Sequence, residues 1–251
     1  MPNTPLDIRP ITAEDIPVIA ALMREVHGEQ TRLTEAYLTW QYVENPNGLV
    51  VGYNAWDSDQ LAAHYACMPV MMEEERWLWS LNTATHPDYR GQGLFPRLAE
   101  LTYQRGTNEG YSAVIGVANA QSAGGFIRKL GFQELGRLSV YLNIFTKITT
   151  PFIARRFDFG HRLKHLGRSQ GCLELTVIHR KGVPVLGNTM PGCVLRAPHV
   201  YIGLHRPDRM VGFKLPERWK PSPWVAIVRE LAGTAHDVKR IQIEALDSDS
   251  I

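Results

Sequence analysis

The stretch Leu81–Phe95 reads LNTATHPDYRGQGLF and decides the fold more than any other part of the chain. A β-prone run leads into a glycine-rich turn, and the amphipathic segment Leu94–Arg105 predicts a helix directly after it. Gly91 and Gly93 allow the backbone to curl so that its N–H groups converge, and the helix adds the positive end of its dipole. The sequence therefore predicts an anion cradle that suits a diphosphate. The alternative is that the turn is only a tight connection.

This turn resembles the acetyl-CoA signature of the GNAT superfamily of N-acetyltransferases, Arg/Gln-x-x-Gly-x-Gly/Ala, with Arg90, Gly93 and Phe95 at its fixed positions. Phe95 departs from the pattern, because a large residue replaces a small one. A pyrophosphate contact there needs only the main-chain N–H, so the side chain is free to turn into the core. A second stretch, Val117–Phe132 (VANAQSAGGFIRKLGF), resembles the family's second motif, an Asn-initiated helix that ends in Lys-Leu-Gly-Phe.

The order of the predicted elements matches the same family. We expect strands and helices at Leu6–Ile11, Ile16–Val26, Leu33–Val43, Leu49–Trp56, Leu61–Met72, Leu81–Thr85, Leu94–Arg105, Tyr111–Val117, Asn119–Leu130 and Phe132–Phe145. The resemblance implies an α/β (α+β) fold of the GNAT type, with a central mixed, mostly antiparallel sheet flanked by helices. We place an acyl-CoA-binding core at residues 1–148.

Residues 149–251 are predicted to form a β-rich C-terminal extension that packs on the core and contributes to the acceptor site. A basic, helical piece is expected at Phe152–Leu166. Further β-prone pieces follow at Cys172–His179, His199–Leu204, Trp224–Leu231 and Ile241–Leu246. The last of these strands could return to the core sheet, and the alternative is a separate small domain.

Charge is divided unevenly along the chain, whose net charge is +2. Residues 1–150 hold 11 Lys/Arg and 16 Asp/Glu, whereas residues 151–251 hold 16 and 9. A basic surface in the C-terminal third suits an anionic acceptor, with RNA or a carrier protein as less favoured partners. The alternative is a scattered set of solvated arginines.

Composition excludes several classes of protein. No apolar run reaches the roughly 18 residues that a membrane span needs, and the start MPNTPLDIRP does not resemble a signal peptide. Cys67, Cys172 and Cys193 have no paired spacing, so neither a disulfide framework nor a metal site is indicated. We therefore expect a cytoplasmic protein with buried thiols and no membrane partner, either a monomer or a homodimer.

The resemblance implies the residues that bind acetyl-CoA or another acyl-CoA. Main-chain groups of Thr83, Ala84 and Thr85 would pair with the pantetheine chain. Asn119 and Ser122 are candidates for further contacts with the donor. The pyrophosphate would be held by Arg90, Gly91, Gln92, Gly93, Leu94 and Phe95.

Catalytic side chains are harder to assign. Many family members carry a tyrosine, as the acid for the leaving thiolate, at the position that Ile127 occupies here. Tyr111 and Tyr141 are substitutes only if the fold brings them to the sulfur. His64 and His86 are the candidate bases, because imidazole titrates near neutral pH. Asn82 could orient the amine, and the alternative for both histidines is a purely structural role.

We therefore expect an enzyme, an acyl-CoA-dependent GNAT N-acyltransferase that transfers groups other than aminoacyl groups to the amine of a small molecule. The strings HYACMPV (His64–Val70) and WQYVENPNG (Trp40–Gly48) resemble a subgroup of polysaccharide and natural-product pathways, which suggests an amino sugar or a pathway intermediate. The alternatives are a GNAT-fold transferase that uses an acyl-carrier protein or aminoacyl-tRNA, and a non-catalytic acyl-CoA-binding regulator.

Overall fold

The computed structural model of the chain describes residues 5–29, 31, 33–45, 47–72, 75–143, 174–180, 183–189, 200–203, 212–214, 224–231, 233, 242–243 and 246–247. Its central sheet is built from β1 (Asp7–Pro10), β2 (Val51–Asp57), β3 (Gln60–Met72), β4 (Glu75–Thr85), β5 (Ala113–Asn119), β6 (Gln133–Arg137) and β12 (Trp224–Glu230). The strands lie in the order β1-β2-β3-β4-β5-β12-β6. Only β4 and β5 run parallel, so the predicted mixed, mostly antiparallel sheet is confirmed.

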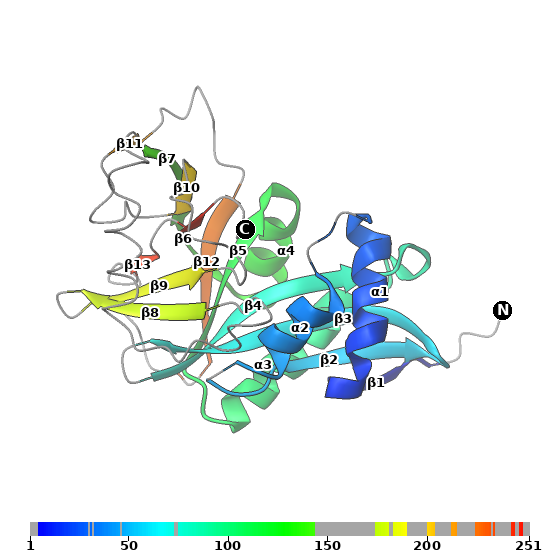
Figure 1. Cartoon of the computed structure of the whole chain (residues 1–251). Helices are drawn as coiled ribbons and strands as arrows, with labels where there is room; N and C mark the ends of the chain where they lie inside the picture. The colour runs from blue at the N-terminus through cyan, green and yellow to red at the C-terminus, as the bar shows by residue number, and fades with distance from the viewer. Residues whose placement is uncertain are drawn as a thin grey trace.

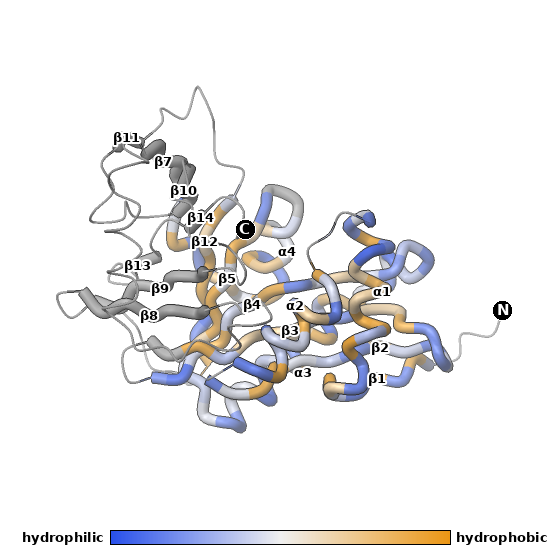
Figure 2. The backbone as a smooth tube through the Cα atoms, viewed as in Figure 1, coloured by the Kyte–Doolittle hydropathy of each residue, from blue (hydrophilic) through white to orange (hydrophobic). Residues whose placement is uncertain are grey.

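Helices cover both faces of this sheet (Figure 1). They are η1 (Ala13–Asp15), α1 (Ile16–His27), α2 (Glu35–Tyr42), η2 (Pro87–Tyr89), α3 (Leu94–Asn108) and α4 (Ala120–Leu130). One apolar cluster joins α1 and α2 to the sheet, and a second joins α3 and α4 to its other face. Figure 2 shows how apolar residues gather along the central strands and the inner helix faces.

Each α-helix of the described residues lies where the sequence predicts it, because the signals are local. Ile16, Ile19, Leu22 and Met23 of α1 recur at helical spacing, and all are buried. Gly131 follows α4 with a φ of +68°, a left-handed conformation that favours glycine as the residue that ends a helix. These local patterns fix the two helical layers on either side of the sheet.

The expected single strand Phe132–Phe145 is wrong. The chain forms β6, which lies in the central sheet, and then β7 (Ser139–Asn143), which lies in another sheet. Leu138 separates the two strands, is buried, and donates its N–H to the carbonyl of Trp224 at 3.0 Å. The break therefore depends on a strand that comes much later in the chain.

That strand is β12, which runs antiparallel between β5 and β6. Arg229 of β12 makes a two-pronged ion pair with Glu100 of α3, at 2.8 and 3.0 Å. A strand from the C-terminal third is thus part of the central sheet, but it is not the strand that the sequence analysis favoured. The last predicted piece, Ile241–Leu246, forms β13 and β14 in two other sheets. The division at residue 148 into core and extension stays a prediction.

Two smaller sheets complete the described part of the chain. One holds β7, β10 (Val200–Gly203), β11 (Gly212–Lys214) and β14 (Leu246–Asp247), and the other holds β8 (Glu174–Arg180), β9 (Val183–Thr189) and β13 (Gln242–Ile243). The β-prone pieces predicted in this third correspond to β8, β10, β12, β13 and β14. The predicted helix Phe152–Leu166, Cys172 and Cys193 lie outside the described residues.

Candidate functional site

Strands β4 and β5 separate midway along the sheet. Trp77–Ser80 of β4 pairs with Ala113–Gly116 of β5, and the pairing between the two strands ends there. Strand β4 nevertheless continues to Thr85, still paired with β3 on its other side. The peptide groups of Leu81–Thr85 that point away from β3 are therefore offered to an added chain, as the sheet edge in β-strand addition is.

A β-bulge lies at the point of separation. The register between β3 and β4 shifts so that Asn82 and Thr83 both lie opposite Tyr65. Asn82 takes a φ of +50°, a left-handed conformation that asparagine adopts more readily than most residues. The bulge re-aims the Asn82 side chain and bends the end of β4 away from β5.

The glycine-rich turn after β4 has the geometry of an anion cradle. Gly91 and Gly93 have φ values of +79° and +72°, and Gly93 is the N-cap of α3. Arg90–Gly93 is exposed, and a Cβ added at either glycine would meet no atom within 4 Å. The first N–H groups of α3 have no partner within the helix, so they and the helix dipole face this open turn. A diphosphate fits such a cradle.

Phe95 confirms the prediction that its side chain turns inward. Its ring packs edge-on against Tyr65 at 5.6 Å and against Phe126 at 5.0 Å, measured between ring centroids. The main-chain N–H stays in the first turn of α3, where the cradle is. The large residue is therefore accommodated by the core without closing the cradle.

Asn119 and Ser122, the other candidates for donor contacts, bond to each other at the start of α4. The N–H of Ser122 donates to Asn119 Oδ1 at 2.9 Å, and the N–H of Asn119 donates to Ser122 Oγ at 3.1 Å. This reciprocal pair caps the helix. Both side chains are exposed or half-buried, and their contact with a donor stays a prediction.

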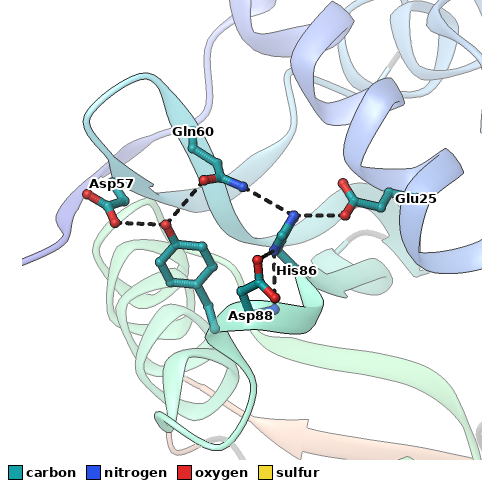
Figure 3. Close-up of polar contacts among 6 residues, drawn as sticks. Glu25, Asp57, Gln60, His86 and Asp88 are labelled. Atoms are coloured by element: carbon teal, nitrogen blue, oxygen red, sulfur yellow. Dashed lines mark hydrogen bonds and ion pairs between the residues drawn. The ribbon is translucent and has the colours of Figure 1, made fainter. Parts of the chain in front are cut away.

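His86 ties the signature loop to its surroundings, as Figure 3 shows. Its Nδ1 accepts the N–H of Asp88 at 3.3 Å, and its Nε2 lies 2.8 Å from Glu25 of α1 and 3.1 Å from Gln60 at the β2–β3 turn. Four residues of extended chain, about 13 Å, separate it from Asn82. His86 is therefore placed to anchor the loop before the cradle.

His64 lies beneath the bulge and is 1% exposed. Both ring nitrogens are engaged: Nδ1 with Asn54 Oδ1 at 2.7 Å, and Nε2 with the hydroxyl of Tyr42 at 2.8 Å. Burial lowers the pKa of His64 to about 3, so the ring is neutral at neutral pH. This geometry suits a residue that positions its neighbours.

Asn82 is joined to the same buried group from the side of the sheet that α2 covers. Its amide nitrogen donates to the hydroxyl of Tyr42 at 3.1 Å and to Gln41 Oε1 at 2.5 Å. Sequence reasoning missed Tyr42, Gln41 and Asn54. The available signal was that Gln41 lies between Trp40 and Tyr42, and Asn54 between Tyr53 and Ala55, so that each is a polar residue between apolar ones.

The candidate acids are not brought to the bulge. Ile127 packs against the apolar cluster of α3 and α4, as its position in α4 requires. Tyr111 precedes β5 and accepts a hydrogen bond from Arg76 at 2.7 Å, near the end of the sheet where β4 and β5 are still paired. Tyr141 belongs to β7, which pairs with β10 and β11 in a different sheet.

Cys67 is buried as predicted, and burial raises its thiol pKa to about 12. Among the residues that the structure describes, no group of His, Cys, Asp or Glu side chains is arranged to hold a metal ion. No helix within the described ranges is both long and apolar enough to cross a membrane. Location in the cytoplasm stays a prediction.

Comparison with solved structures finds GNAT-like folds at low identity. A candidate acetyltransferase from Pyrococcus horikoshii is 13% identical, with 96% of each chain covered and a TM-score of 0.55. A conserved Enterococcus faecalis protein, a candidate N-acyltransferase, is 11% identical over 91% of this chain and 73% of its own, with a TM-score of 0.53. An Escherichia coli GNAT family N-acetyltransferase in complex with CoA is 16% identical over 99% and 93%, with a TM-score of 0.48.

A search of curated proteins gives no significant match. The model of the acetyltransferase (GNAT) domain family matches residues 7–135, about half of the chain, and includes β4, the cradle and α4. The separated strands, the bulge and the cradle all fall within that match. The chain therefore belongs to the GNAT acetyltransferase family.

Proposed function

We propose that this protein is an N-acyltransferase that moves an acyl group, most simply acetyl, from coenzyme A to the amine of a small molecule. The carrying observation is the open turn Gly91–Gly93 at the N-terminus of α3, immediately after a strand that has left its neighbour. The cradle suits the diphosphate of acetyl-CoA, and the free edge of β4 suits its amide-rich pantetheine arm. Family membership supports the same donor.

In the proposed reaction the neutral amine attacks the thioester carbonyl carbon. A carbon–nitrogen bond forms, the carbon–sulfur bond breaks, and the amine gives up one proton to water. Holding both reactants in place can contribute about 7 to 11 kcal/mol toward the barrier. The leaving thiolate of coenzyme A takes its proton from water, which is compatible with an apolar residue at Ile127.

The acceptor proposed is a small amine with an anionic group, because the C-terminal third carries 16 Lys/Arg against 9 Asp/Glu. An amino sugar joined to a nucleotide has this chemistry. Residues 149–251 are proposed to contribute to its binding.

A second candidate function is a non-catalytic acyl-CoA-binding regulator. Ile127 favours the regulator, because the position that carries an acidic tyrosine in many members of the family holds a side chain that cannot donate a proton here. The two functions differ in one observable. An enzyme releases free coenzyme A thiol when an amine is added, whereas a regulator binds acetyl-CoA without releasing it.

The test uses acetyl-CoA binding and thiol release together. Gly93→Asp would place a carboxylate in the cradle, and Gly110→Asp is its matched control at the other end of α3. The control glycine has a φ of +78°, close to that of Gly93, and a Cβ there would also meet no atom within 4 Å. We expect Gly93→Asp to weaken acetyl-CoA binding at least tenfold and Gly110→Asp to leave it unchanged.

Calorimetry gives the affinity, and a thiol assay over a panel of amines gives turnover. Equal affinity in the two variants would contradict the cradle. Tight acetyl-CoA binding with no thiol release from any amine would favour the regulator.

A further inference from the structure

A continuous chain of buried hydrogen bonds leads from the bulge to the start of α1. The links are Asn82 Nδ2 to Tyr42 hydroxyl (3.1 Å), Tyr42 hydroxyl to His64 Nε2 (2.8 Å), His64 Nδ1 to Asn54 Oδ1 (2.7 Å), and Asn54 Nδ2 to Asp15 Oδ2 (3.2 Å). Tyr42, His64 and Asn54 are each at most 1% exposed, and Asp15 is 8% exposed. Five residues from η1, α2, β2, β3 and β4 are thus linked.

The direction of every bond follows from the carboxylate at the end. Asp15 only accepts, so Asn54 donates its amide nitrogen to it and offers its oxygen to His64. His64 therefore carries its proton on Nδ1 and accepts on Nε2. Tyr42 must then donate to His64, which leaves its oxygen lone pairs for the Asn82 amide nitrogen.

This direction fixes the orientation of the Asn82 amide. Its two amide hydrogens are taken by Tyr42 and Gln41. Turning the amide over would set the Asn82 oxygen against Gln41 Oε1 and leave the Tyr42 oxygen without a donor. In the described part of the chain, Asn82 Oδ1 has no hydrogen-bond partner, and the residue is half-buried at the bulge.

We propose that Asn82 Oδ1 accepts a hydrogen bond from the acceptor amine, and that Tyr42, His64, Asn54 and Asp15 are positioning residues that hold it there. The proposal rests on the proposed N-acyltransferase function. A single N–H···O bond from the amine turns its lone pair toward the thioester carbonyl, at the point where β4 leaves β5. A hydrogen-bond acceptor that is held in this position selects nucleophiles that can donate a hydrogen bond.

The positioning role predicts a specific pattern in the kinetics. Asn82→Gly removes the side chain and keeps the left-handed backbone, and Tyr42→Phe removes only the hydroxyl. Each should lower kcat/KM for the amine roughly tenfold to a hundredfold, because a misplaced reactant loses about this much. The double variant should fall no further than Asn82→Gly, because Tyr42 acts only through Asn82.

The matched control is Tyr103→Phe. Tyr103 is also a buried tyrosine whose hydroxyl bonds to another side chain, Tyr65 at 2.5 Å, but it lies on the face that α3 covers. It should retain kcat/KM within a factor of about two, since the hydrogen bonds of Tyr103 and Tyr65 do not reach the Asn82 side chain. Acetyl-CoA affinity should be unchanged in all variants, which shows that each folds. The pH dependence of kcat/KM should also be unchanged, including in Tyr42→Phe, where His64 loses a hydrogen bond, as expected of a positioning residue rather than a base.

Additive losses in the double variant, or an equal loss in Tyr103→Phe, would overturn the proposal. A second measurement needs no turnover and separates this failure from that of the proposed function. Nitrogen-15 NMR should find His64 protonated on Nδ1, and the Asn82 side-chain amide hydrogens should exchange slowly in the wild type and rapidly in Tyr42→Phe. Unchanged exchange would refute the positioning role even if no amine is acylated.

Discussion

The neutrality of His64 predicts a particular dependence of stability on pH. In the folded protein, burial lowers the His64 pKa from 6.5 to about 3. As the pH falls below 6.5, His64 becomes protonated in the unfolded chain but stays neutral in the folded protein. The stabilisation is therefore complete above that pH, and it is lost progressively between the two pKa values.

The magnitude follows from the width of this window. Each pH unit within it changes the free energy of unfolding by about 1.4 kcal/mol, so moving from about pH 8 to about pH 5 removes about 2 kcal/mol. This loss of free energy depends little on the pKa of His64 in the folded protein, provided that this pKa lies well below 5. This is a large share of the roughly 5 to 15 kcal/mol that stabilises a typical domain.

The assay is urea unfolding at both pH values for wild type and His64→Gln, followed by tryptophan fluorescence. The variant is expected to be less stable at each pH but to lose about 2 kcal/mol less than the wild type on acidification. Comparing the two differences cancels the other titrating groups. His27→Gln is the control, because His27 is more exposed and burial lowers its pKa less.

Equal pH dependence in wild type and His64→Gln would refute the reasoning. So would an NMR signal showing that His64 is protonated in the folded protein near pH 5. Either result would mean that the hydrogen bonds to Tyr42 and Asn54 tolerate an imidazolium ion.

Three further substitutions test the packing that supports the site. Gly52→Ala should destabilise the fold by about 3 kcal/mol in urea titrations, because its Cβ would overlap the carbonyl oxygen of Tyr65, which is backbone and cannot yield. Arg229→Ala should cost only about 0.5 to 1 kcal/mol, because its partner Glu100 is 44% exposed. The hydrogen bond from Arg229 lowers the Glu100 pKa, so this cost should shrink as pH falls below 4.5, which repeated urea titrations would reveal. Phe95→Ala should lower stability by about 2 to 3 kcal/mol in the same assay, yet leave acetyl-CoA affinity within a few-fold, because the main-chain N–H is kept.

Much of the fold was predictable because its signals are local. The apolar face of α1, the hairpin of β2 and β3, and the glycine turn before α3 each occupy one continuous stretch. The cradle belongs to this class, since its N–H groups come from consecutive residues. A short sequence pattern therefore predicts both its position and its chemistry.

The insertion of β12 was not predictable in the same way. The run Phe132–Phe145 predicts one strand when it is considered alone. In the structure, residues 224–230 pair only with its first half. Pairing between distant segments depends on the whole sheet, and no local pattern specifies it. The sequence indicated that Trp224–Leu231 is a strand but not which neighbours it has.

The buried hydrogen-bond chain was missed for a related reason. Its members lie in five elements, and only folding brings them together. His64 appeared as a candidate base because the residue type suits that role, but a base must also be reachable. Its 1% exposure and two hydrogen bonds were not readable from the sequence.

The two faces of the sheet carry different parts of the proposed site, and the bulge in β4 connects them. The cradle lies at the N-terminus of α3, on one face, where main-chain groups are proposed to bind the donor. Asn82 points to the face that α2 covers, where side chains from η1, α2, β2 and β3 determine its orientation. Because the cradle offers main-chain N–H groups, a large side chain such as that of Phe95 is accommodated there. Selectivity for the amine must then reside in side chains such as Asn82, which a family signature does not specify.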